Sequence, residues 1–227
     1  MDDQIGRIRR VHGFLMRHSL YPILLASALA YFLLAARIYR SRSLAHFGLS
    51  WNLILAWVPY LASLWAGHLD RRYPRRWWAL IVPGMVWLAF FPNAPYMVTD
   101  LWYLQYPQTP IPLWYDVGLL TLFALTGLFL AVASLRLMQQ LVRQYAGPLL
   151  SWLFVLVVLG LSGLGVYLGR FLRWNSWDLV LHPKGVLRDV AVRLANPMDN
   201  LQTFGVTFLF AAILFVCYLT FASRERA

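Results

Sequence analysis

Six long apolar stretches alternate with short polar or charged segments along the chain. They cover roughly residues 19–38, 48–67, 77–98, 114–136, 148–169 and 202–222. Each is close to the ~20 residues that a helix needs to cross the hydrocarbon core of a bilayer. The pattern predicts an all-α fold, a polytopic transmembrane helical bundle with about six spans, in a single integral membrane domain over residues 1–227.

Two shorter segments have an amphipathic pattern. In residues 4–17, apolar residues recur at helical spacing with arginines between them. In residues 186–196, Val186, Val190 and Leu194 fall on one side of a helix. This pattern is typical of helices that lie in the headgroup region of a membrane. We therefore expect two short interfacial helices.

Composition agrees with a membrane protein and adds an orientation. The chain is 60% hydrophobic and 13% charged, whereas soluble domains carry about 25% charged residues. The net charge of +11 comes from basic residues scattered between the apolar stretches. That distribution argues against nucleic acid as a partner and favours the lipid bilayer with its anionic headgroups. The side that holds both termini carries twelve of the 20 basic residues, so the positive-inside rule predicts cytoplasmic termini.

The sequence lacks the usual motifs for a metal or a cofactor. The only cysteine is Cys217 and the only glutamate is Glu225, so a cysteine metal site and an HExxH motif are both excluded. The histidines fall in predicted loops or at span ends, whereas a haem would need axial ligands within the bundle. These histidines are His12, His18, His46, His68 and His182. We expect no metal and no cofactor.

The third apolar stretch runs into an unusual sequence, AFFPNAPYMVTDLW, over residues 89–102. Pro92 and Pro95 each lack the N–H that a helix uses, so each disrupts the helix that precedes it. Asn93 is placed to cap a new short helix. The sequence therefore predicts a broken third span, with a kink at Pro92 and a short helix that leads to Asp100. Broken helices form substrate sites in transporters.

Span parity places the end of the third span, the start of the fourth and the end of the fifth on one membrane face. Seven polar residues collect there: Asn93, Asp100, Asp116, Arg170, Arg173, Asn175 and Asp178. Charges near the hydrocarbon core usually pair with one another, and an arginine fork can hold a carboxylate or an anionic ligand. We expect Asp100 and Asp116 to face Arg170 and Arg173. Two alternatives stay open, a structural clamp made of these ion pairs or an open site for a ligand.

The fifth stretch contains GLSG at residues 160–163, which is similar to the GxSG of rhomboid proteases. That chemistry needs a histidine to activate the serine, and the sixth stretch has none. Small residues are more typical of positions where membrane helices approach closely. In this stretch they are Gly160, Ser162, Gly163, Gly165 and Gly169.

The segments FFPNAPYMVTDL and YLGRFLRWNSWDL resemble an uncharacterised family of bacterial multipass membrane proteins, the domain of unknown function number 1361. The resemblance covers roughly residues 31–222. It implies a place in the bacterial inner membrane and a shared fold, and it implies no reaction. The matching residues are Phe91, Pro92, Asn93, Ala94, Pro95, Tyr96, Thr99 and Asp100, then Gly169, Arg170, Arg173, Asn175, Trp177 and Asp178.

Three functions fit these observations. The first is transport of a small molecule or ion, or membrane-embedded binding, at a site between the third, fourth and fifth spans. Six spans are few for a complete transporter, so a homodimer or a membrane partner subunit is expected with it. The second is a structural or assembly subunit of a membrane complex. The third is an enzyme for a lipid-linked substrate, with Asp100 or Asp116 as the acid–base group and Arg170 and Arg173 as phosphate ligands. Because no complete catalytic constellation is present, an enzyme is the less favoured of the three.

Overall fold

The computed structural model describes residues 20–74, 76–106 and 111–223, and every regular element in these ranges is a helix. This confirms the all-α fold. The interfacial helix expected over residues 4–17 lies outside the described residues.

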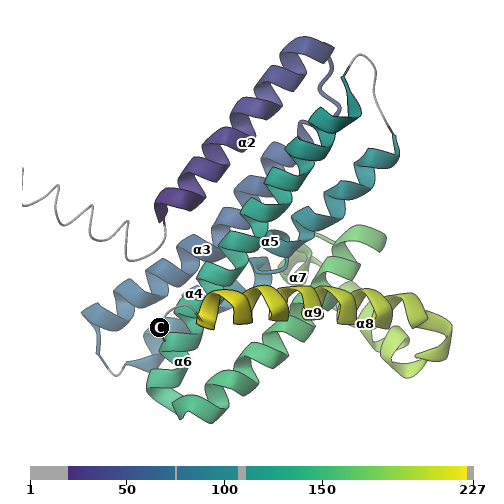
Figure 1. Cartoon of the computed structure of the whole chain (residues 1–227). Coiled ribbons are helices and arrows are strands. Elements are labelled where there is room, and N and C mark those ends of the chain that lie inside the picture. Colours follow the sequence, from purple (N-terminus) through teal and green to yellow (C-terminus); the bar gives the residue numbers. More distant parts are fainter. Residues whose placement is uncertain (1–19, 75, 107–110, 224–227) are drawn as a thin grey trace, which may run out of the picture.

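The first two long helices are α2 (Leu20–Ser41) and α3 (Gly48–Arg72). The buried residues of α2 recur every three or four positions, from Ile23 through Ala30 to Arg37. Such spacing places them along one face of a helix. This face of α2 turns toward α6, and α3 packs against both α4 and α6 (Figure 1).

Four short elements follow each other in the third apolar stretch. They are η1 (Trp77–Leu80), α4 (Ile81–Phe90), α5 (Asn93–Tyr96) and η2 (Met97–Gln105). The α-helical hydrogen bonding is interrupted after Phe90, directly before Pro92, as the sequence predicts. The chain nevertheless continues in the same helical region of backbone space, because Pro92 has φ −61° and ψ −22°. The third span therefore keeps a helical path through the break and continues as the tighter 3-10 helix η2 from Met97.

The longest element, α6 (Leu113–Phe171), has 59 residues and bends at one glycine. At 1.5 Å per residue a straight helix of this length would run about 90 Å, roughly three times the hydrocarbon thickness. Gly147 has φ 86° and ψ 176°, outside the helical region, and Pro148 follows it. The chain turns back there, so α6 consists of a first limb over 113–146 and a second limb over 148–171 (Figure 1).

Within the described residues, five helical stretches are long and apolar enough to cross a membrane, with α6 as one of them. With α6 divided at Gly147, helical segments cover all six apolar stretches found in the sequence. The structure is therefore that of an all-α membrane bundle, while the depth at which each helix meets the bilayer stays a prediction.

Beyond α6 the chain forms α7 (Asp178–Leu181), α8 (Pro183–Ala195), η3 (Met198–Asn200) and α9 (Leu201–Ser223). The amphipathic segment over 186–196 falls almost entirely in α8. Helix α9 packs mainly against α6, across which it runs in Figure 1.

Candidate functional site

The break in the third span is stabilised by a side chain of its own. Asn93 donates from Nδ2 to the carbonyl oxygen of Phe90 at 3.0 Å and to the hydroxyl of Ser176 at 2.7 Å. The carbonyl oxygen of Phe91 accepts the N–H of Ala94 at 3.2 Å. The expectation that Asn93 caps the new helix is wrong, since α5 has no side-chain cap. Its amide instead donates to the carbonyl oxygen of Phe90, so this backbone group is not left unpaired at the break.

Three glycines of α6 pack closely against the helix break, one from the first limb and two from the second. A Cβ atom on Gly165, in the second limb, would lie 2.6 Å from Cγ of Pro92. On Gly127, in the first limb, it would collide with the carbonyl oxygen of Ala94. A Cβ atom on Gly169 would lie 3.3 Å from the ring of Tyr96. The bent segment fits between the limbs because these positions lack side chains.

The other small residues of the fifth stretch differ from one another. Gly163 lies against the carbonyl group of Thr207 in α9, where a Cβ atom would collide with it. The expectation of close helix approach therefore holds at Gly163 as well as at Gly165 and Gly169. A Cβ atom on Gly160 would meet open space, with no neighbouring atom within 4 Å among the described residues, so Gly160 has no such role.

Asp116, in the first turn of α6, pairs with an arginine outside the predicted polar cluster. Its Oδ1 accepts Nε of Arg37 at 2.7 Å, and its Oδ2 accepts Nη2 at 3.0 Å. Both side chains are buried, at 1% and 5% exposure for Arg37 and Asp116. The expected pairing of Asp116 with Arg170 or Arg173 is therefore wrong. Two parallel bonds of this kind make a fork-to-fork contact, which fixes the geometry of both groups.

Asp100 does face Arg170, but the contact is loose. Nη1 of Arg170 lies 3.8 Å from Oδ1 of Asp100, which is an ion-pair distance too long for a hydrogen bond. Oδ2 accepts Nδ2 of Asn52, in α3, at 2.9 Å. The guanidinium of Arg170 lies over the ring of Tyr103, 5.4 Å from its centre. Asp100 is 1% exposed, so its charge is buried with one amide and one distant arginine.

Arg173 lies outside the cluster. It is exposed and has φ 60°, a left-handed conformation that ends the helical path of α6. Among the described residues it has no ion pair. The predicted pairing of Arg173 with a carboxylate is therefore wrong, because the chain turns away from the bundle before its side chain can reach one.

Asn175 and Asp178 form a local turn after α6. The backbone N–H of Asn175 donates to Oδ2 of Asp178 at 2.8 Å, and its side chain donates to the same oxygen at 3.3 Å. Nδ1 of His182 lies 3.2 Å from Oδ1 of Asp178. The backbone bond from Asn175 is the main reason that the pKa of Asp178 is lowered from 3.8. The turn places the Asn175 side chain back over the helix break.

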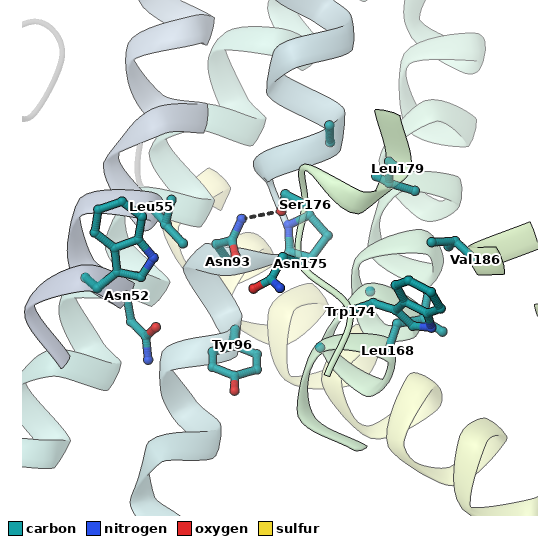
Figure 2. Close-up of a pocket in the computed structure, with 15 residues that line it drawn as sticks. Asn52, Leu55, Asn93, Tyr96, Leu168, Trp174, Asn175, Ser176, Leu179 and Val186 are labelled. Carbon is teal, nitrogen blue, oxygen red and sulfur yellow. Dashed lines mark hydrogen bonds between the residues drawn. The ribbon is translucent and has the colours of Figure 1, made fainter. Parts of the chain in front are cut away.

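A pocket of about 140 Å³ lies beside the break (Figure 2). Its walls come from α3, from the third span, from the second limb of α6 and from the segment after it. The expected site was between the third, fourth and fifth spans, whereas the pocket uses the second span in place of the fourth. Its lining residues are Trp51, Asn52, Leu55, Ala89, Pro92, Asn93, Tyr96, Gly165, Leu168, Gly169, Trp174, Asn175, Ser176, Leu179 and Val186.

The predicted polar cluster divides into two groups around this pocket. Asn93, Asn175 and Pro92 line it, whereas the charged residues and Pro95 do not. The ion pair of Asp100 and Arg170 lies behind the residues that line the pocket. Asn52 lines the pocket and donates to Asp100 of that pair.

Two residues of the site, Arg37 and Asn52, lie outside the predicted cluster but could have been found from the sequence. Arg37 continues the three- and four-residue spacing of the buried face of α2, so its direction follows from the helical period. Asn52 is a polar residue early in the second span, which starts on the same membrane face. Ser176 and Trp174 have no such signal, because a loop after a helix end has no period to place its side chains.

Comparison with known proteins identifies the family and nothing closer. A family described as Protein of unknown function (DUF1361) matches residues 51–217. The chain belongs to this family, over a somewhat narrower range than the resemblance suggested. No curated protein and no solved structure matches the chain.

Proposed function

We propose that this member of the DUF1361 family is a membrane-embedded binding protein, which takes a small polar molecule into the pocket beside the Pro92 break. The observation that carries the proposal is the lining of the pocket. Three asparagines, one tyrosine and one serine line a concave site whose other lining residues are apolar. Pockets with a few convergent polar groups on apolar walls are the usual form of a ligand site.

The polar groups are held in place before any ligand arrives. Asn52 is fixed by Asp100, Asn93 by the carbonyl of Phe90, and Asn175 by Asp178. Side chains that are already oriented lose little freedom when they bind. A helix break surrounded by polar side chains is also the arrangement in which transporters hold their substrates, so transport is a natural extension of binding here.

The enzyme hypothesis has less support. Asp116 has both carboxylate oxygens bound by Arg37, and Asp100 does not line the pocket. A general acid or base must lie within hydrogen-bond reach of the proton that it transfers. Neither carboxylate has that position relative to the pocket.

A binding screen tests the proposal. Thermal unfolding of the purified protein is measured with amines, polyols, amino acids and carboxylic acids. We expect at least one class to raise the unfolding temperature, and we expect Ala89→Phe, which fills the pocket, to abolish that rise. Ala28→Phe, at an exposed position of α2, is the matched control and should keep it. If no compound acts through the pocket in this way, the proposal fails. Flux of a confirmed ligand into proteoliposomes then separates transport from binding alone.

Location and orientation complete the proposal. We place the protein in the bacterial inner membrane as a multipass protein with both termini in the cytoplasm, on the strength of the basic residues on that side. A reporter enzyme that is active only outside the cytoplasm, fused after α9, should then be inactive. Activity of that fusion would reverse the orientation.

A further inference from the structure

The chemistry of the pocket ligand can be inferred from how the carboxamides are held. Asn52 donates to a carboxylate, Asn93 to a backbone carbonyl and Asn175 to a carboxylate. Carboxylate and carbonyl oxygens only accept hydrogen bonds. The nitrogen of each amide must therefore face its internal partner, and each amide oxygen must face the other way.

The oxygens of these three amides are left to the pocket. In the described part of the chain, no hydrogen bond reaches Oδ1 of Asn52, Asn93 or Asn175. Figure 2 shows the Asn93 amide with its nitrogen toward Ser176 and its oxygen on the opposite side. Since all three residues line the pocket, the pocket is rich in acceptors.

Two aromatic side chains on the pocket wall also favour a cationic ligand. Trp51 and Trp174 line the pocket, and Nε1 of Trp174 already donates to Asp189 at 2.8 Å. What Trp174 can offer a ligand is therefore its ring. Indole faces attract cations, and among the described residues no arginine, lysine or histidine lines the pocket.

The pocket wall also has donors, because the amide nitrogens of Asn52 and Asn175 each keep a second N–H. The Ser176 hydroxyl accepts from Asn93, which leaves its own proton to donate. A ligand that satisfies the pocket thus carries a group with several N–H donors and, close to it, an oxygen acceptor.

Burial at the site is incomplete, which matters for a cation. Trp51 is 52% exposed and Leu179 is 46% exposed at the rim. Span parity predicts that this rim lies at a membrane face, where a charged group would keep part of its hydration and avoid the full cost of burying a charge.

We propose that the pocket binds a primary ammonium group with a neighbouring hydroxyl or ester oxygen, as in an ethanolamine unit, held by the amide oxygens of Asn93 and Asn175, which lie close together in Figure 2. This inference rests on the proposed binding function and names its ligand class. The shared chemistry exists in free amino alcohols and in the headgroup of phosphatidylethanolamine.

The test compares three probes of nearly equal size. Calorimetry is performed on the full-length protein in phosphatidylglycerol nanodiscs with ethanolamine, ethylene glycol and glycolate. Because hydrogen bonds from an ionised donor are stronger than neutral ones, we expect ethanolamine to bind about tenfold more tightly than ethylene glycol, and glycolate to bind least.

Variants connect the preference to the amides. Asn175→Ala should weaken ethanolamine binding about tenfold while it leaves ethylene glycol less affected. Its backbone N–H still bonds Asp178, so the fold is kept even if Asn93→Ala does not fold. Asn196→Ala is the control, because this exposed asparagine also donates to a backbone carbonyl and lies outside the pocket.

The outcomes separate the inference from the proposed function. Ethylene glycol or glycolate could bind as tightly as ethanolamine, or more tightly, in a way that Ala89→Phe abolishes. That result would overturn the inferred ammonium ligand and leave the proposed binding function standing. Ethanolamine binding that survives both Asn175→Ala and Ala89→Phe also overturns it. If neither the three probes nor the compounds of the wider screen bind, both the ligand class and the proposed binding function are rejected. Binding of free ethanolamine is also measured in nanodiscs made with phosphatidylethanolamine. Weaker binding there means that the lipid headgroup competes and is the ligand of the pocket. Unchanged binding means that the ligand is a free amino alcohol.

Discussion

The guanidinium of Arg37 holds the carboxylate of Asp116 through bonds of 2.7 and 3.0 Å, although 79 residues separate them in the chain. The pair joins the last turns of α2 to the first turn of α6. The neighbouring carboxylate, Asp100, has only an amide bond and an arginine 3.8 Å away. The bundle thus holds a tight ion pair between Arg37 and Asp116 and a loose one between Arg170 and Asp100.

Removing one partner of the tight pair should destabilise the protein strongly. Asp116→Leu leaves the buried charge of Arg37 without compensation, which typically costs about 3–5 kcal/mol. Chemical unfolding of the purified protein measures the loss. The double variant with Arg37→Met and Asp116→Leu should recover most of it, since an apolar pair of similar volume removes both charges. A single variant as stable as the wild type would show that the pair contributes nothing to the fold.

Glycine at the helix break should not tolerate a methyl group. Gly127→Ala places a Cβ atom against the carbonyl oxygen of Ala94, and we expect a loss of about 1–3 kcal/mol from overpacking. Gly160→Ala is the matched control in the same helix, with open space around it. It should be neutral or gain up to about 1 kcal/mol from helix propensity. Equal effects of the two substitutions in an unfolding experiment would contradict the close approach.

The amide of Asn52 should stabilise the fold through Asp100. Asn52→Leu removes the only hydrogen bond that the buried carboxylate accepts in the described part of the chain, and hydrogen bonds to charged groups contribute about 1.5–3 kcal/mol. Thermal or chemical unfolding measures the difference from wild type. Asn196→Ala, at an exposed position, should stay within about 0.5 kcal/mol of it. A loss for Asn52→Leu no greater than that of the control would show that Asp100 finds another partner.

Stability should fall in mild acid because of His46. This histidine lies between α2 and α3, is buried, and contacts the ring of Tyr103. Burial, and then the charge of Arg37, lowers its pKa from the ordinary 6.5, which Asp116 only partly opposes. As the pH falls through 6.5, the unfolded chain binds a proton that the folded chain refuses, so the free energy of unfolding decreases.

The control for this pH effect is His46→Phe, which keeps a ring beside Tyr103 and cannot titrate. Its unfolding free energy should change less than that of the wild type between about pH 7 and pH 5, a window set by the unperturbed histidine pKa. Parallel curves for the two proteins would mean that His46 is protonated in the folded state.

The parts of the fold that were predictable are those that depend on neighbours in the chain. The apolar stretches, the interruption before Pro92 and the role of Gly165 each follow from a few consecutive residues. Proline removes a hydrogen bond from the interior of any helix, and about 20 apolar residues are enough for a helix to cross a membrane. Span parity then brought Asn93 and Asn175 to one face without any knowledge of packing.

The sequence by itself thus determined an all-α membrane protein and the position of its broken span. Only the tertiary structure decided that Arg37 binds Asp116, that Arg173 points away and that three amides surround a pocket. The physical reason is the range of the interactions. Backbone hydrogen bonds and apolar length act within a segment, whereas an ion pair needs two side chains from distant helices within about 4 Å. The rotation of each helix, fixed at close contacts such as Gly127 with Ala94, sets which of them meet.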